Sequence, residues 1–350
     1  MNTPVRARGY ARRDAMLVIG AVVAVAPGLG AARAAAMPLT TGTVFTADEK
    51  GGSISAIDLA SGRVRTVPLS IMPHNAQVAP DGQTVLLVGM GMDAGHTASG
   101  AGKLIVLDAR DITRPPRAEI VIGPHPAHVV TDAAGSRAFI TDSTKNAVLV
   151  VDLSAGRMMR EIPVGTYPHG LRASPDGREL YIANMRSADV SVVDIATLAE
   201  IGRIGVGKLP VQVGFTPDGA EVFVSLNGEN KVAIIDRVRR QAVATVPVGR
   251  NPVQVQATPD GRFVYVANQG TATSPADTVS VIDVGARKVV ATIRTGRGAH
   301  GVTVSNDGRA VFVSNIVDST VTAIDTQALR KAATYKVGAG PNGISFRAAS

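Results

Sequence analysis

One stretch of this sequence recurs along the chain and constrains the fold more than any other feature. In its clearest copy, residues 168–177 read PHGLRASPDG, and the runs RELYIAN, VSVVD and IGRIGVG follow before position 208. The Pro-Asp-Gly turn ends the first segment, because proline fixes φ and glycine tolerates positive φ. The three later runs are short and rich in β-branched or aromatic residues, which favour strands. Each copy therefore predicts four consecutive strands.

Two recurring residues allow the copies of this repeat to be counted. The turn glycine recurs with spacings of 53, 42, 42, 42 and 47 residues, at Gly82, Gly135, Gly177, Gly219, Gly261 and Gly308. An aspartate at the end of the third predicted strand recurs seven times, at Asp58, Asp108, Asp152, Asp194, Asp236, Asp283 and Asp325. Four strands in a repeat of this length are typical of a β-propeller blade, and the apolar residues do not follow the helical period. The sequence predicts an all-β, seven-bladed β-propeller with four-stranded blades.

The two counts differ by one, which indicates that one blade is built from both ends of the chain. Residues 44–48 and 54–58 read as a second and a third strand with no first strand before them. Residues 341–347 read as a first strand with no partners after it. We expect the C-terminal strand to complete the N-terminal blade, which closes the ring and leaves no open sheet edge.

The N-terminal segment has the features of a signal peptide. An apolar run at 15–26 follows four arginines, and the small residues 34–36 form a cleavage site. The run is shorter than the ~20 residues that span a bilayer. We expect a signal peptide at 1–36, a linker at 37–42 and the propeller at 43–347. The mature protein would then be periplasmic or secreted, without a membrane span. Arg12 and Arg13 leave both the general and the twin-arginine export routes open.

Composition excludes several kinds of chemistry. The chain has no cysteine, so it has no disulfide, no thiol nucleophile and no attachment site for a c-type haem. Residues 1–36 hold five arginines and one aspartate, so cleavage would reduce the formal net charge from +8 to about +4. A charge of this size does not by itself argue for nucleic acid as a partner.

Several segments resemble a known repeat. The runs YIAN at 181–184, YVAN at 265–268 and FVSN at 312–315, with SPDG at 174–177 and VVD at 192–194, are similar to the YVTN-type seven-bladed β-propeller repeat. The resemblance covers residues 43–347 and implies the fold rather than one function. Families with such propellers include periplasmic proteins of uncertain role, surface-layer proteins, lactonases, nitrite reductases and amine dehydrogenases. This chain departs from the redox members because it has no haem-attachment motif and no tryptophan.

Histidines gather where the first strands begin. In a propeller blade this strand lines the central channel, so these residues should share one channel mouth. We predict a ligand site there formed by His74, His128, His169 and His300, with Gln212, Gln254 and Asn342 at the matching places of other blades. A ring of imidazoles can hold a divalent metal. The same histidines can instead cap the turns that precede the strands.

If the mouth binds a metal, His74, His169 and His300 should be the primary ligands, because they share one register of the repeat. His128 lies one residue deeper and would turn to the opposite side of an ideal strand. A long predicted loop carries His96, Met90 and Met92, which could cover the site. Thioether and imidazole ligands together favour copper over zinc.

Basic residues occur in the loops of the same face. Lys208, Arg250 and Arg297 lie in these loops, and Arg172 lies further along a first strand. This basic rim could attract a small anionic ligand. The alternative is an ordinary solvated rim of loop charges.

Two classes of function remain open. The first is an exported, non-catalytic binding or scaffold propeller that takes a small ligand or a protein partner at the histidine-rich mouth. The second is a secreted lactonase-like enzyme or a metal-dependent lyase or hydrolase, or else a copper or other metal-binding accessory protein. No paired-carboxylate or nucleophile–base arrangement is visible in the sequence, which favours the binding function.

The predicted leader gives the first test. Cleavage after about Ala36 should yield a periplasmic or secreted protein whose intact mass corresponds to a chain that begins near Met37. Mass spectrometry of the protein from each cell fraction measures this. A full-length mass confined to the cytoplasm would contradict the export prediction.

Overall fold

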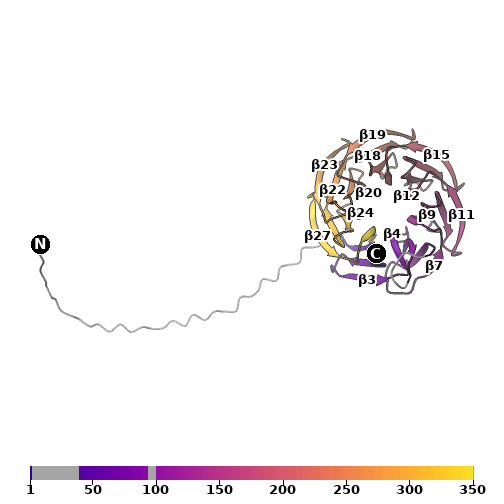
Figure 1. Ribbon diagram of the computed structural model, residues 1–350, viewed down its shortest axis with the longest axis horizontal. Helices are drawn as coiled ribbons and strands as arrows, with labels where there is room; N and C mark the ends of the chain where they lie inside the picture. Colours follow the sequence, from indigo (N-terminus) through magenta and orange to yellow (C-terminus); the bar gives the residue numbers. More distant parts are fainter. Residues whose placement is uncertain (2–38, 94–99, 350) are drawn as a thin grey trace. The chain divides into compact units, whose positions relative to one another are not determined.

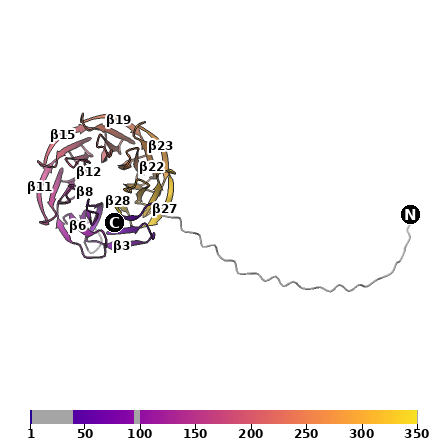
Figure 2. The same cartoon turned by 180° about the vertical axis from the view of Figure 1, so that it is seen from behind.

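The computed structural model describes residue 1, residues 39–93 and residues 100–349. Over residues 39–93 and 100–349, the strands form seven antiparallel sheets of four strands each, and no helix is present. The sheets follow one another around a ring (Figures 1 and 2). The predicted seven-bladed β-propeller is therefore confirmed. Within these described residues, no helix is long and apolar enough to cross a membrane.

Each blade is a simple meander from the centre of the ring outward. The innermost strands are β4 (Ile71–Val78), β8 (Pro126–Thr131), β12 (Pro168–Ala173), β16 (Pro210–Phe215), β20 (Pro252–Ala257), β24 (Ala299–Val304) and β28 (Pro341–Ala348). The second strands are β1 (Gly42–Asp48), β5 (Thr84–Gly91), β9 (Arg137–Asp142), β13 (Glu179–Asn184), β17 (Glu221–Leu226), β21 (Phe263–Gly270) and β25 (Ala310–Asn315).

The outer half of each blade completes the sheet. The third strands are β2 (Ser53–Asp58), β6 (Lys103–Asp108), β10 (Ala147–Asp152), β14 (Asp189–Asp194), β18 (Lys231–Asp236), β22 (Pro275–Asp283) and β26 (Thr320–Asp325). The outermost strands are β3 (Val64–Pro68), β7 (Ala118–Val121), β11 (Arg157–Pro163), β15 (Ala199–Gly205), β19 (Gln241–Pro247), β23 (Lys288–Arg294) and β27 (Arg330–Lys336).

The two ends of the ring are joined within one sheet. Strand β28 pairs antiparallel with β1, with Ser345 opposite Phe45 and Phe346 opposite Val44. The sheet order β28-β1-β2-β3 shows that the C-terminal strand supplies the innermost position of the first blade. Ring closure by the C-terminal strand is therefore confirmed.

Local hydrogen bonds explain why the repeated turn forms. In Ser174–Gly177, the Ser174 hydroxyl donates to Asp176 Oδ1 (2.6 Å), and the Gly177 amide donates to the Ser174 carbonyl oxygen (2.8 Å). Gly177 has φ of 70°, a region that residues with a Cβ rarely adopt. The Glu179 amide then donates to Ser174 Oγ (3.0 Å), which starts β13. The serine, the aspartate and the glycine thus each stabilise this turn.

Packing between blades depends on one aromatic position in the second strand. The side chains there are fully or almost fully buried: Phe45, Phe139, Tyr181, Phe223, Tyr265 and Phe312. Each sits in an apolar cluster shared by neighbouring blades, as Tyr181 does with Val222 and Val224 of the next blade. Burial of a side chain of this size stabilises the fold by about 1.5–3 kcal/mol. These rings are structural and do not form a stacking surface.

Every innermost strand carries a β-bulge near its start. In β12, Pro168 pairs with Asn184 and Leu171 with Ile182, so His169 and Gly170 together face one residue of β13. The other six innermost strands show the same register shift. A bulge bends the strand and re-aims its side chains. Residues from both bulge positions can therefore face the channel, which an ideal strand would not allow.

Ring closure leads to a stability prediction. Deletion of residues 341–350 should leave the inner edge of β1 unpaired and remove Ile344, which is 5% exposed. Loss of one such side chain costs about 2–5 kcal/mol, and 1 kcal/mol corresponds to about 2–4 °C in Tm for a domain of 150–250 residues. We therefore expect Tm to fall by about 10 °C or more in a thermal melt.

The matched control removes only residues 349–350, which follow the last strand. This shorter protein should melt like the full-length chain. An equal Tm for the ten-residue deletion would show that the C-terminal strand does not hold the ring.

Candidate functional site

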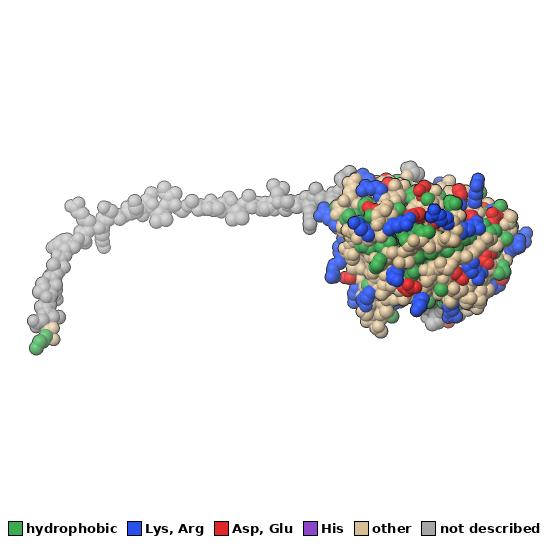
Figure 3. Space-filling view, turned by 90° about the horizontal axis from the view of Figure 1, so that it is seen from above, with side chains coloured by type: hydrophobic (Ala, Val, Ile, Leu, Met, Phe, Trp, Pro, Cys, Tyr) green, Lys and Arg blue, Asp and Glu red, His purple; other side chains and the backbone are tan. Residues whose placement is uncertain are grey.

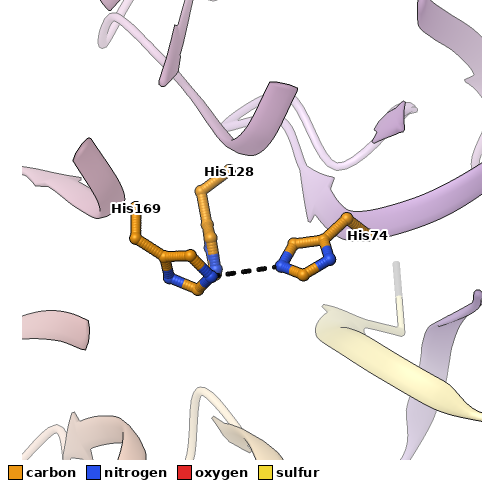
Figure 4. Close-up of side chains that lie close together, drawn as sticks. All are labelled: His74, His128 and His169. Atoms are coloured by element: carbon orange, nitrogen blue, oxygen red, sulfur yellow. Dashed lines mark hydrogen bonds between the residues drawn. The ribbon is translucent and has the colours of Figure 1, made fainter. Parts of the chain in front are cut away.

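Three imidazoles converge at one mouth of the channel (Figure 4). His74 comes from β4, His128 from β8 and His169 from β12. One ring nitrogen from each of these side chains can be chosen so that all three lie within 4.8 Å of one another. The ring centroids are 4.9–5.7 Å apart. The structure therefore brings together three histidines from three neighbouring blades.

This group differs in one member from the predicted metal ligands His74, His169 and His300. The structure places His128 with His74 and His169, and His300 is not part of the group. The expectation that His128 turns away assumed an ideal strand. The β-bulge changes that geometry, because His128 occupies the second bulge position of β8 while His74 and His169 occupy the first position of their strands. We refer to His74, His128 and His169 as the histidine triad.

Glu49 forms a hydrogen bond with the imidazole ring of His74. Its Oε1 lies 3.0 Å from His74 Nδ1, and its Oε2 accepts a hydrogen bond from Asn342 Nδ2 (2.6 Å). Burial opposes the charged carboxylate, but the positive charge of His74 and the two hydrogen bonds lower the pKa of Glu49 to about 2. Burial likewise opposes a charged His74, yet Glu49 raises the pKa of His74 above its usual value. Both shifts favour the charged pair, in which a Glu49 carboxylate faces a His74 imidazolium.

His169 shares a proton with His74. His169 Nδ1 lies 3.2 Å from the carbonyl oxygen of Val211, which can only accept, so Nδ1 carries a hydrogen. Its Nε2 then presents a lone pair to His74 Nε2 at 3.3 Å. Burial and the charge of His74 lower the pKa of His169 to about 3. His74 is thus the imidazolium, and it donates from one nitrogen to Glu49 and from the other to His169.

His128 is the most enclosed member of the triad. Gln212 Nε2 lies 3.3 Å from His128 Nδ1, and Gln212 Oε1 accepts from the Val213 amide (2.8 Å), so the glutamine is fixed in orientation. His128 Nε2 is buried and has no hydrogen-bond partner among the described residues. Burial, with the nearby positive charges, lowers the pKa of His128 well below its usual value. Gly170 makes room for this arrangement, since a Cβ there would clash with the Gln212 amide.

The remaining channel residues named from the sequence form a neighbouring polar group. His300 Nδ1 lies 3.2 Å from the carbonyl oxygen of Asn342, and burial lowers the pKa of His300 to about 4. Gln254 Oε1 accepts from the Val302 amide (3.3 Å), while Gln254 Nε2 is buried without a partner among the described residues. Gln254 and Asn342 therefore line the channel, and Asn342 also connects to the triad through Glu49.

The basic residues of the rim are partly neutralised. Arg297 pairs with Asp318 (2.7 Å), and Arg250 donates to Ser274 Oγ (3.2 Å). The Lys208 amide donates to Glu229 Oε1 (2.7 Å). On the side of the ring, which Figure 3 shows, basic and acidic side chains are also mixed. The rim is thus not a uniform basic surface.

The other sequence-derived candidates fall elsewhere. Arg172 lines a cavity that also contains Pro80 and Asn306 of the turns, and its charge contributes to the lowered pKa of His128. Its assignment to the channel mouth stays a prediction. Met90 lies opposite Met72 at the end of β5, and the Met92 thioether packs against Gly52. His96 and the leader at positions 2–36 lie outside the described residues.

Comparison with known proteins places the chain in a family. The model described as "Lactonase, 7-bladed beta-propeller" matches residues 40–246, which is more than half of the chain. The chain belongs to this lactonase family of seven-bladed propellers. A second model, "YNCE-like beta-propeller", matches residues 245–349. Neither match is specific to the YVTN type, so that narrower resemblance stays a prediction.

Solved structures share the fold of this lactonase-family propeller. A functionally unknown protein from Desulfotomaculum acetoxidans DSM 771 has a TM-score of 0.74 at 15% identity, covering 89% of this chain and 100% of that one. A chain of Kuenenia stuttgartiensis hydrazine synthase has a TM-score of 0.66 at 20% identity, covering 77% and 88%. No curated protein matches the chain significantly. At these identities the likeness shows the fold alone.

Glu49 is the site residue that the sequence analysis of this lactonase-family propeller missed. It directly follows Asp48, the last residue of β1. The residues at the same position of the repeat in the other six blades are Met90, Ser143, Met185, Asn227, Gln269 and Ile316. Glu49 is the only acid among them, and it lies on the histidine face. That departure from the repeat was the available signal.

The shared proton predicts the titration behaviour of the histidines. In NMR titrations of the imidazole protons, His74 should titrate above its usual pKa, while His169 and His300 stay neutral until about pH 3–4. Glu49→Gln should lower the pKa of His74, because it removes the carboxylate that favours the charged ring. The buried neutral rings should also make the fold less stable as pH falls from about 6.5, since the unfolded chain binds more protons there.

His125 provides the reference for this titration. It is exposed, and its Nδ1 lies 2.9 Å from Ser143 Oγ in a loop outside the triad. Its imidazole chemical shifts at a fixed pH should be the same in wild type and in Glu49→Gln. An unchanged His74 in that variant would contradict the proposed charge pair.

Proposed function

We propose that this protein is an exported, non-catalytic binding propeller that holds a divalent transition-metal ion in the histidine triad at its channel mouth. The observation that carries the proposal is the convergence of three imidazole nitrogens within 4.8 Å. Three histidines with one open position form a common metal site in proteins. The open position would face the channel mouth, where a small ligand or a protein partner could bind.

The spacing of two nitrogens already matches a metal site. Ligand nitrogens at ~2.0–2.1 Å from a tetrahedral zinc ion are about 3.3 Å apart. His74 Nε2 and His169 Nε2 are separated by 3.3 Å. His128 needs only a modest rotation of its ring to reach the same ion, because its nitrogen is within 4.8 Å of the other two.

The outer contacts of the rings support metal binding. A metal-ligating histidine usually donates its other ring nitrogen to a carboxylate or a carbonyl, which orients the ring and increases its basicity. His74 has this contact with Glu49, and His169 has it with Val211. For His128 the partner is the amide of Gln212, which would have to rotate if Nε2 is the ligand atom. Two of the three rings are therefore pre-oriented.

The proton between His74 and His169 occupies the position that a metal ion would take. Both rings commit their other nitrogen to an acceptor, so the two facing nitrogens can share either one proton or one metal ion. Metal binding should then release a proton and weaken as the pH falls. Imidazole ligands suit zinc, copper and nickel. The preference for copper depended on methionine ligands, and the triad does not require them.

Lactone hydrolysis is a second candidate function. It is favoured by the family of the chain and by the contact between Glu49 and His74, which resembles the pairing of a general base with the carboxylate that orients it. In this alternative, neutral His74 would activate a water molecule for attack on the lactone carbonyl. The protein itself would supply the base, and the triad would not need a metal.

Metal titration tests the proposal. The metal-free, tag-free protein should bind one equivalent of Zn²⁺ or Cu²⁺ in isothermal titration calorimetry at pH 7.5. His169→Ala should weaken binding by at least about 100-fold, and Glu49→Gln by about 10–100-fold, the usual cost of losing an outer contact. Gln212→Glu should tighten binding, because a carboxylate can accept from both Val213 and His128.

The matched control is His125→Ala, which removes an exposed histidine outside the triad and should not change the affinity. Equal weakening in His125→Ala and His169→Ala, or no stoichiometric binding in the wild type, would contradict the metal site. Hydrolysis of lactones by the metal-free protein that is lost in His74→Gln would favour the second candidate instead.

A further inference from the structure

The far end of the channel holds a second polar site. A cavity of about 390 Å³ lies among the last residues of the innermost strands, next to the turns at Pro80 and Asn306. We propose that this cavity binds a small carboxylate anion bearing hydroxyl groups, with Arg172 as the group that holds the carboxylate. No histidine of the triad lines this cavity, although the charge of Arg172 is near enough to contribute to the lowered pKa of His128.

Arg172 is a charged residue without an acidic partner. It lies on β12, and the contact of its guanidinium with the described residues is one hydrogen bond from Nη1 to the carbonyl oxygen of Leu171 (3.1 Å). Burial lowers the pKa of Arg172 to about 10, so the group stays charged at neutral pH. A guanidinium has five N–H donors in a planar fork that matches a carboxylate. The other four donors have no partner among the described residues.

The absence of acidic residues gives the cavity a positive charge. Its lining contains no aspartate or glutamate among the described residues. Elsewhere in this protein buried or half-buried arginines are paired, as Arg137 is with Asp132 and Arg237 with Glu179. Leaving one partly buried arginine unpaired costs free energy unless an anion compensates it. A bound carboxylate would provide that compensation.

Other polar groups in the cavity are also unpartnered. The side chains of Thr131, Thr303, Gln256 and Asn306 line it and form no hydrogen bond with the described residues. Thr131 is only 8% exposed and Thr303 only 6%. Neither hydroxyl is among the atoms that are sealed from solvent without a partner, so both open onto the cavity. These donors and acceptors indicate a ligand with hydroxyl groups in addition to its carboxylate.

The repeat explains how space for a ligand arises. The residues opposite the second-strand aromatic position are Gln77, Val130, Arg172, Gly214, Gln256, Thr303 and Ser345. Gly214 contributes no side chain to this row, and the volume of the cavity lies in the range of small-molecule sites, ~300–1,000 Å³. One long cation and several short polar groups thus share one level of the channel.

Calorimetry with defined probes tests the proposal. The metal-free full chain should bind gluconate, used as the hydroxycarboxylate probe, more tightly than acetate, and should not bind the uncharged polyol sorbitol. Arg172→Gln should weaken gluconate binding by at least about 10-fold. Arg178→Gln, which alters an exposed arginine of the adjacent turn, should leave binding unchanged.

Two further measurements separate this site from the triad. His169→Ala should retain gluconate binding, and Arg172→Gln should retain Tm and stoichiometric metal binding, with equal or higher metal affinity because it removes a positive charge that acts on His128. No gluconate binding, equal binding by Arg172→Gln, or equal binding of sulfate and gluconate would each overturn the proposal. If metal binding failed while gluconate binding followed Arg172, this inference would stand and the proposed metal function would fall.

Discussion

The antiparallel pairing of β28 with β1 is the constraint on which the rest of this structure depends. Each blade buries its apolar faces only against its two neighbours, so a ring without closure would leave two faces uncovered and one sheet without its innermost strand. Closure also fixes how the innermost strands approach one another. As a result His74 and His169, which are 95 positions apart in the sequence, come within 3.3 Å. Both the stability of the fold and the geometry of the histidine site therefore depend on the closed ring.

The β-bulge is the second determinant of the site. It lets residues from two successive positions of an innermost strand face the channel. In several innermost strands only one of the two bulge positions carries a large side chain. Where the second position is glycine, the first carries a larger polar side chain, as in His169–Gly170, His300–Gly301 and Asn342–Gly343. Where the second is His128, the first is the small residue Ala127. Neighbouring strands thereby avoid competing for the same space.

Charge is arranged differently at the two ends of the channel. At the histidine end, Glu49 compensates one positive charge, which is the proton now shared by His74 and His169 or a metal in its place. At the turn end, Arg172 has no carboxylate beside it. The family supplies the scaffold for both ends, but the two solved structures compared above are only 20% and 15% identical to the chain. Function therefore has to be argued from these side chains and not from the fold.

The sequence by itself determined the architecture, because turn glycines and third-strand aspartates each have a local physical reason to recur at a fixed spacing. It also located the channel mouth, since His74 and His169 share a register that the repeat makes visible. It did not determine which histidines meet. His128 joins the triad because a backbone bulge turns it toward the channel. Glu49 reaches His74 from a loop of the blade that is assembled from both ends of the chain. The position of Arg172 follows from the direction of its strand. These are relations between segments far apart in sequence, and only the tertiary structure fixes distances of that kind.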